Sequence, residues 1–274
     1  MPVRIKICGI TNLEDAEAAI AAGADALGFI LYEKSKRFIS IEQAIAIVET
    51  LPPFVQTVAV TVNATKEFTN LGWRKQLKNF GIAQLHGEET PTHVKAVSKY
   101  LPVIKVFPAQ PRTFAPANTA PVLEHAVKTA HQVKEKQEEL KESLGREPSL
   151  DEVTKEMGLP KDPVHPAVQL MQEPRFEPMR PAEYDSLVSA FMLDTPSKDH
   201  GGTGRVFDWN LAVDFKTRIT RPLILSGGLN PENVAKAIET VQPYAVDVAS
   251  GVEASPGRKD HAKLRDFIQI CKSL

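Results

Sequence analysis

The sequence predicts an α/β fold, a (β/α)8 TIM barrel with an all-helical insertion between the fifth and sixth strands. The first observation is that short apolar runs alternate with amphipathic runs of helical period, and eight such units can be counted. The second is a long segment between units five and six, where one short helix would suffice. Repeated strand–helix order implies parallel strands joined by crossovers, and eight units are enough to close a barrel.

Each unit contributes one predicted strand. The strands are residues 4–10, 26–31, 57–62, 82–87, 103–108, 190–195, 222–228 and 245–251. Predicted helices include 12–23, 40–51, 91–101, 231–240 and 260–274. Asn12 and Ser40 suit N-caps, and Pro231 suits a first helical turn. An open doubly wound sheet is the structural alternative, but the G-x-G-x-x-G fingerprint is absent after the first strand.

The composition is that of an ordinary soluble globular protein. Apolar residues make up 42% and charged residues 24%, and the net charge of −1 offers no general attraction for nucleic acid or membranes. No apolar run is long enough to span a bilayer, and the chain enters a strand directly, so a cytoplasmic location is expected. Cys8 and Cys271 lack a CxxC or His-rich setting, which predicts two reduced thiols and no metal site.

Polar residues gather where the predicted strands end. In a barrel these ends meet at one mouth, which carries the catalytic groups. The residues concerned are Cys8, His86, Asp194, Ser226, Asp247 and Ser250. Glycine-rich loops follow strands six, seven and eight at 200–205, 226–230 and 249–253, where backbone N–H groups can approach an anion. Three such loops on consecutive units predict a phosphoester substrate.

The chain resembles the phosphoribosylanthranilate isomerases of tryptophan biosynthesis. The resemblance covers roughly residues 3–110 and 183–273. It is carried, in order, by KICGIT, GADALGFIL, SKRFIS, QLHGEE, FMLDTPSKDHGGTGRVFDW, LSGGLNPENV and VDVASGVE. It implies an Amadori rearrangement of N-(5-phosphoribosyl)anthranilate to 1-(2-carboxyphenylamino)-1-deoxyribulose 5-phosphate, a small-molecule phosphoribosyl substrate, and no cofactor or metal.

The resemblance also implies roles for residues of this chain. Cys8 would be the general base and Asp194 the general acid. A thiol with an ordinary pKa of about 8.5 needs positive neighbours to serve as a base at neutral pH. Arg37 would hold the anthranilate carboxylate. The phosphate would lie on the backbone around Gly202, Gly228, Ser250 and Gly251, with His86 and Asp247 supporting the wall of the site.

The inserted segment defines the expected domain boundaries. Residues 1–114 and 183–274 form the barrel, and 115–182 form a helical insert with Pro-rich flanks. One long helix is expected at 121–145, a second at 148–158 with a Ser149–Glu152 capping box, and the start of a third at 161–172.

Residues 138–174 resemble region 3 of the sigma-70-class bacterial sigma factors, which suggests a chimera, natural or engineered. Nine Lys or Arg against twelve Asp or Glu in 119–180 give this region a charge of −3, which argues against binding nucleic acid. The insert is expected either to contact a protein partner or to be inert.

Two other functions stay open at this point. The histidine-pathway isomerase performs the same chemistry on another phosphoribosyl substrate, but it uses an Asp at the tip of its first strand, where this chain has Cys8. A noncatalytic barrel that presents the insert to a protein partner is the alternative of a different class. The presence of Cys8, Arg37 and Asp194 together weighs against it.

Overall fold

The computed structural model divides the chain into two compact units. The first comprises Met1–Gln110 and Arg180–Leu274, and the second comprises Pro111–Met179. The residues that the structure describes are 2–64, 70–109, 136, 139–141, 143–144, 146, 148–158, 181–195 and 206–274.

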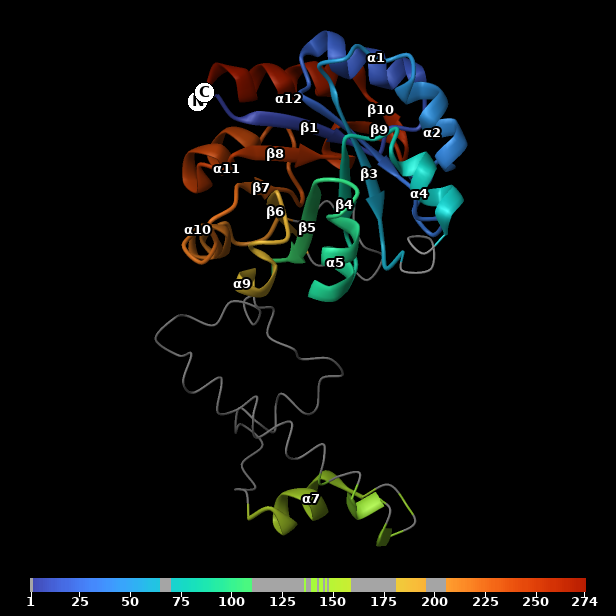
Figure 1. Ribbon diagram of the computed structural model, residues 1–274. Coiled ribbons are helices and arrows are strands. Elements are labelled where there is room, and N and C mark those ends of the chain that lie inside the picture. The colour runs from blue at the N-terminus through green and yellow to red at the C-terminus, as the bar shows by residue number, and fades with distance from the viewer. Residues whose placement is uncertain are drawn as a thin grey trace. The chain divides into compact units, whose positions relative to one another are not determined.

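The first unit is a closed barrel of eight parallel strands, with β8 hydrogen-bonded to β1 (Figure 1). The predicted (β/α)8 fold is thereby confirmed. The strands are β1 (Arg4–Cys8), β2 (Ala26–Ile30), β3 (Gln56–Thr61), β4 (Ile82–Leu85), β5 (Val103–Pro108), β6 (Ala190–Asp194), β7 (Leu223–Leu225) and β8 (Ala245–Val248). Strands β1 and β7 end earlier than predicted, because Gly9 and Gly227 turn the chain with φ of 76° and 89°.

Helices surround the barrel. They are α1 (Leu13–Ala22), α2 (Ile41–Val48), α4 (Leu71–Leu77), α5 (Pro91–Val97), α9 (Pro181–Tyr184), α10 (Asn210–Lys216), α11 (Val234–Val241) and α12 (His261–Ser273). In the described ranges, no helix combines the length and the apolar composition that crossing a membrane requires.

Two of the three helix starts predicted in the barrel follow the sequence. The Asn12 side chain accepts a hydrogen bond from the Asp15 N–H, and Ser40 forms a capping box with Gln43. Helix α11 begins at Val234, three residues later than predicted, and Pro231 lies in the hydrogen-bonded turn that precedes it. The side chains of Asn230 and Asn233 each accept a hydrogen bond from the other's backbone N–H, which closes a turn before the helix.

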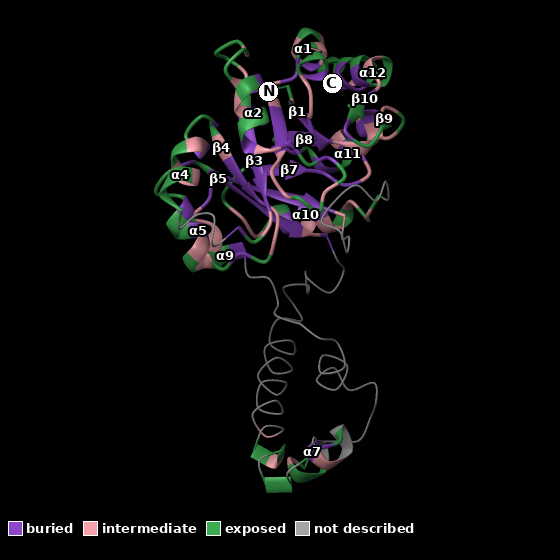
Figure 2. Cartoon of the chain, turned by 90° about the vertical axis from the view of Figure 1, so that its right-hand side faces the viewer, coloured by how far each residue is buried: buried purple, intermediate pink, exposed green. Residues whose placement is uncertain are grey.

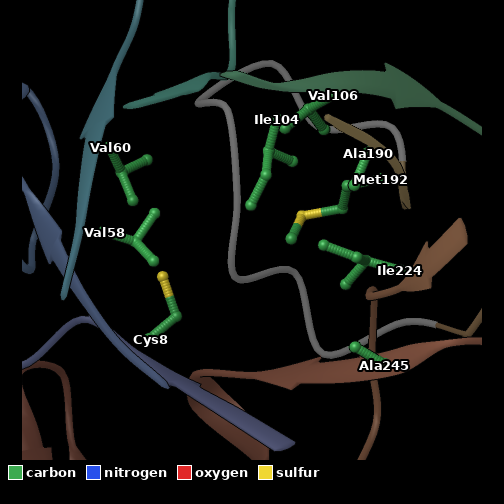
Figure 3. Close-up of a cluster of buried hydrophobic side chains, with 9 residues drawn as sticks. All are labelled: Cys8, Val58, Val60, Ile104, Val106, Ala190, Met192, Ile224 and Ala245. Atoms are coloured by element: carbon green, nitrogen blue, oxygen red, sulfur yellow. The ribbon is translucent and has the colours of Figure 1, made fainter. Parts of the chain in front are cut away.

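Alternate residues of the strands fill the barrel interior (Figure 3). The cluster consists of Cys8, Val58, Val60, Ile104, Val106, Ala190, Met192, Ile224 and Ala245. The opposite faces of the strands lie beneath the helices, where Phe107, Phe191 and Phe215 pack with ring centroids 5.6–5.8 Å apart. Figure 2 shows the buried residues concentrated on the strands and on the inner sides of the helices.

A short hairpin after β8 was not predicted. A 3₁₀ turn (Ser250–Val252) leads into β9 (Glu253–Ser255), which pairs antiparallel with β10 (Arg258–Lys259) before α12 begins. The hairpin is too short to show a strand pattern in the sequence. It nevertheless places two charged side chains, Glu253 and Lys259, in buried positions.

In the second unit, the described residues include one complete helix, α7 (Leu150–Glu156). The predicted capping box is present: the Ser149 hydroxyl accepts from the Glu152 N–H, and the Glu152 carboxylate accepts from the Ser149 N–H. Arg146 adds an ion pair with Glu152, and these bonds hold the pKa of Glu152 at about 2. The long helix predicted at 121–145 and the third at 161–172 lie largely or wholly outside the described residues.

Candidate active site

The polar residues predicted at the strand ends lie at one mouth of the barrel. Cys8 is the last residue of β1 and Asp194 the last of β6, while His86 follows β4 directly. The eight strands of the barrel are all parallel, so these ends point the same way. Cys8 belongs to the interior cluster, and Asp194 follows Ala190 and Met192 of that cluster at spacings of two, which directs both side chains inward.

Cys8 is a buried free thiol whose surroundings oppose and favour its ionisation at once. Burial raises the pKa of the thiol above its ordinary value, and the Asp247 carboxylate acts in the same direction. The ammonium groups of Lys6 and Lys259 act in the opposite direction. Lys259 also donates to the Cys8 backbone carbonyl over 2.7 Å, which fixes the end of β1.

Asp194 accepts one backbone hydrogen bond and lies close to the ring of His86. The Thr195 N–H donates to Oδ1 over 2.8 Å, and Nε2 of His86 lies 3.2 Å from Oδ2. The side-chain amide of Gln84 faces the other ring nitrogen of His86 at 3.4 Å, Nε2 to Nδ1. His86 therefore lines the wall of the site in contact with the carboxylate.

Arg37 is anchored by the unpredicted hairpin. Its Nε and Nη2 donate to the two carboxylate oxygens of Glu253 over 2.8 and 2.7 Å. Lys259 donates to Glu253 as well, over 3.1 Å, with its ammonium fully buried. Although burial alone would raise it, the pKa of Glu253 is held below its ordinary value by these two cations. This two-point pair leaves the Nη1–Nη2 edge of the guanidinium for a second carboxylate.

A second buried ion pair lies inside the barrel. Lys6 of β1 and Asp247 of β8 stand opposite each other in the register of the two strands, and Nζ lies 2.6 Å from Oδ1. The Ser226 hydroxyl donates to the other carboxylate oxygen of Asp247 over 3.0 Å. Sequence reasoning singled out Asp247 and Ser226 but missed Lys6. The available signal was a lysine flanked by isoleucines in the middle of a strand, a position that is almost never buried without a partner.

The glycine-containing loops after β7 and β8 lie at the edge of the mouth. Gly228, Ser250 and Gly251 are each partly exposed there, and Gly227 and Gly228 both have positive φ. A Cβ atom on Gly251 would lie 1.9 Å from the Leu229 carbonyl oxygen, so this close approach of the two loops requires glycine. The predicted contact Gly202 lies outside the described residues. Within the described ranges, no three His, Cys, Asp or Glu side chains are grouped as metal ligands.

Comparisons with known proteins agree with this geometry. A family model described as N-(5'phosphoribosyl)anthranilate (PRA) isomerase matches residues 5–133 and 150–270. The chain is 39% identical over 272 residues to the N-(5'-phosphoribosyl)anthranilate isomerase of Geobacter sulfurreducens, with 98% of each chain covered. It is 37% identical over 273 residues to the enzyme of the same name from Thermotoga maritima, which covers 99% of this chain and 100% of the relative.

Solved structures give the same result. The phosphoribosyl anthranilate isomerase of Thermotoga maritima superposes with a TM-score of 0.67 at 35% identity, over 99% of this chain and 100% of the other. A phosphoribosyl anthranilate isomerase in complex with reduced 1-(o-carboxyphenylamino)-1-deoxyribulose 5-phosphate gives 0.64 at 34% identity, with the same coverage. The chain therefore belongs to the N-(5'-phosphoribosyl)anthranilate isomerase family.

Proposed function

We propose that this protein is a phosphoribosylanthranilate isomerase, which converts N-(5-phosphoribosyl)anthranilate to 1-(2-carboxyphenylamino)-1-deoxyribulose 5-phosphate. The observation that carries the proposal is that Cys8 and Asp194 both face inward at the same mouth of a barrel of this family. The relative solved with a reduced form of that ribulose phosphate is similar over 99% of this chain. The substrate class is therefore a small phosphoribosyl amine.

The reaction needs one acid and one base. In the proposed sequence, Asp194 gives its proton to the furanose ring oxygen, the C1–O bond breaks, and the anthranilate nitrogen forms a Schiff base with C1. The Cys8 thiolate then removes the proton from C2, and the C–H electron pair becomes the double bond of an enamine that tautomerises to the ketose. In the final tautomerisation the Asp194 carboxylate takes the proton of the C2 hydroxyl and the Cys8 thiol gives its proton to C1, which returns both groups to their starting forms.

Arg37 is proposed to bind the carboxylate of the anthranilate ring. Glu253 occupies one edge of the guanidinium through Nε and Nη2, which orients the Nη1–Nη2 edge for a second bidentate contact. The Glu253 contact raises the pKa of Arg37 further, so the side chain is a permanent cation. A fixed cation at this place would select substrates with an aromatic carboxylate.

The substrate phosphate is proposed to lie on the backbone at the ends of β7 and β8. Gly228, Ser250 and Gly251 are partly exposed at this edge of the mouth, and Gly202 is expected to join them. His86 and Asp247 take supporting roles, since each contacts a neighbouring ionisable side chain, Asp194 and Lys6 respectively.

Complementation of a tryptophan auxotroph lacking this isomerase tests the proposal, together with turnover of N-(5-phosphoribosyl)anthranilate in vitro. The wild-type chain is expected to restore growth, and Cys8→Ala and Asp194→Asn are expected to abolish it. Failure of the folded wild-type protein to turn over the substrate would refute the proposed function. Turnover of the histidine-pathway substrate instead would favour the related isomerase.

The inserted segment is proposed to be a transplanted helical region, 115–182, similar to region 3 of sigma-70-class factors. Support comes from the capped helix α7 and from the excess of acidic over basic residues, which favours a protein partner or no partner over nucleic acid. The cytoplasm is the proposed location, because a base mechanism requires Cys8 to stay a free thiol and that compartment keeps thiols reduced.

A further inference from the structure

Lys6 and Cys8 lie two residues apart on β1, and both face the barrel interior. The Cys8 Sγ and the Lys6 Nζ both lie next to Gly28 of β2. A Cβ atom placed on Gly28 of the neighbouring strand would be 2.8 Å from the Cys8 Sγ and 3.0 Å from the Lys6 Nζ. The missing side chain at Gly28 therefore gives the thiol and the ammonium room to approach each other in a place closed to solvent.

The ammonium is fixed in that place by a complete set of contacts. Lys6 is 3% exposed, and its Nζ lies 2.6 Å from Oδ1 of Asp247. Asp247 is also buried, and its second oxygen accepts from the Ser226 hydroxyl. Although burial alone would lower it, the pKa of Lys6 is raised, by Asp247 and by Cys8, so the group is a permanent cation.

A buried ion pair of this kind is costly to place inside a barrel and is weak evidence for stability. Its position beside the proposed base suggests a role in the reaction. We infer that Lys6 is a positioning residue for Cys8, whose fixed ammonium provides the counter-charge for the negative sulfur. This inference rests on the proposed function, in which Cys8 acts as a base.

The proton count of the site shows what the counter-charge would change. In the form that can react, Cys8 is a thiolate and Asp194 is protonated. In the other form, Cys8 is a thiol and Asp194 is a carboxylate. Both forms carry one proton. The ratio of these two forms depends on the relative proton affinities of Cys8 and Asp194 and not on pH. A cation beside the sulfur shifts this ratio toward the working form. The fraction of competent enzyme, and with it kcat/KM, should therefore follow the proton affinity of the thiol.

Among the described residues, four charged groups act on the sulfur from the elements around it. Lys6 is on the same strand, Asp247 on β8, Lys259 on β10, and Arg37 in the loop after β2. Lys259 and Arg37 both donate hydrogen bonds to Glu253. Lys259 contacts Cys8 through the backbone carbonyl of Cys8. Lys6 lies on the same inward face of β1 as the sulfur, two residues before it, and it is buried.

Two variants matched at position 247 isolate the effect of Lys6. Removing Lys6 alone would leave the Asp247 carboxylate buried with no counter-charge, so the single Lys6→Met variant could fail to fold, whereas the amide oxygen of Asp247→Asn can still accept a hydrogen bond from the Lys6 ammonium. We therefore compare Asp247→Asn with the double variant Lys6→Met/Asp247→Asn, in which position 247 is neutral in both proteins. Each is made in a Cys271→Ala background, so that Cys8 is the one thiol left to titrate; burial already raises the pKa of the Cys271 thiol to about 12.

The Cys8 thiol is titrated by its thiolate absorbance near 240 nm, without substrate. The thiol pKa should fall in Asp247→Asn relative to the parent, since a carboxylate near the sulfur is removed. It should then rise by about one unit or more in the double variant, with kcat/KM falling about tenfold for each unit and KM little changed. Folding of both proteins is checked by circular dichroism.

Equal thiol pKa values in the two variants would overturn the inference, and so would a shifted thiol pKa with no matching change in kcat/KM. The titration needs no substrate. A wild-type protein without turnover would therefore refute the proposed function separately, while the link between Lys6 and Cys8 would still be measured.

Discussion

Glu253 clamps Arg37 in place through two hydrogen bonds of 2.8 and 2.7 Å, from a hairpin distant in sequence from the arginine. Glu253→Gln keeps the size of the side chain but removes the charge that orients the guanidinium. We expect KM for N-(5-phosphoribosyl)anthranilate to rise about tenfold and kcat to change much less, because the substrate carboxylate then meets a mobile cation.

Steady-state kinetics on purified protein checks this. Glu239→Gln, at an exposed position on α11, is the matched control and should leave both constants unchanged. An unaltered KM in Glu253→Gln would show that Arg37 is oriented by other contacts or does not bind the substrate.

His86 is expected to act on kcat and not on substrate binding. Its Nε2 lies 3.2 Å from Oδ2 of Asp194, so His86→Asn should leave the acid with a less defined orientation. We expect kcat to fall about tenfold with KM nearly constant. His131→Asn, in the second unit, serves as the control. A kcat equal to that of the wild type would show that His86 does not orient Asp194 for the reaction.

Breaking the buried ion pair of Lys105 and Glu89 should lower stability without affecting the chemistry. Lys105 Nζ donates to Glu89 over 2.9 Å and to the Gly87 carbonyl over 2.7 Å, beneath the helix layer. Lys105→Met leaves a buried carboxylate without its cation, and we expect the free energy of unfolding to fall by about 3 kcal/mol. Urea denaturation measures the change. The exposed Lys95→Met on α5 should cost almost nothing.

The same pair predicts a pH dependence. Although burial alone would raise it, the pKa of Glu89 is held below its ordinary value by Lys105 and backbone N–H groups. A lowered folded pKa stabilises the fold fully above about pH 4.3, and this contribution is lost as the pH falls through the lower folded value. When the pH is lowered below about 4, the Tm of the double variant Lys105→Met/Glu89→Gln should therefore fall less than the Tm of the wild type. Parallel curves for the two proteins would contradict this.

Removal of residues 115–180 should leave a folded barrel. Strands β5 and β6 pair directly, from Ile104 with Ala190 to Pro108 with Asp194, so the barrel closes through contacts of the first unit. Loop closure changes by only about 0.6 kcal/mol for each doubling in length. We expect a cooperative unfolding transition and retained turnover when a short Gly/Ser linker replaces the segment, as followed by circular dichroism and the isomerase assay.

A longer deletion provides the comparison. Extending it through Tyr184 removes the hydrogen bond from the Tyr184 hydroxyl to the Glu89 carbonyl and the ring contact with Phe107, and it should reduce stability measurably. Loss of cooperative unfolding already in the first deletion would mean that the segment is part of the barrel core.

The sequence by itself determined the barrel, because hydrophobic periodicity and strand–helix order are local properties that repeat eight times. It also determined which strand ends carry Cys8, His86 and Asp194, since parallel strands place such ends at one mouth. The caps at Asn12 and Ser40 could also be predicted from the sequence, because each depends only on residues within one helical turn.

The tertiary structure alone decided which charges meet. Lys6 pairs with Asp247 and Arg37 with Glu253, residues separated by 241 and 216 positions, and a single sequence contains no signal for such contacts. Barrel closure brings β8 beside β1, and the short hairpin after β8 returns Glu253 and Lys259 to the end of the first strand. The electrostatic surroundings of the thiol are for this reason a property of the closed barrel and not of any one segment.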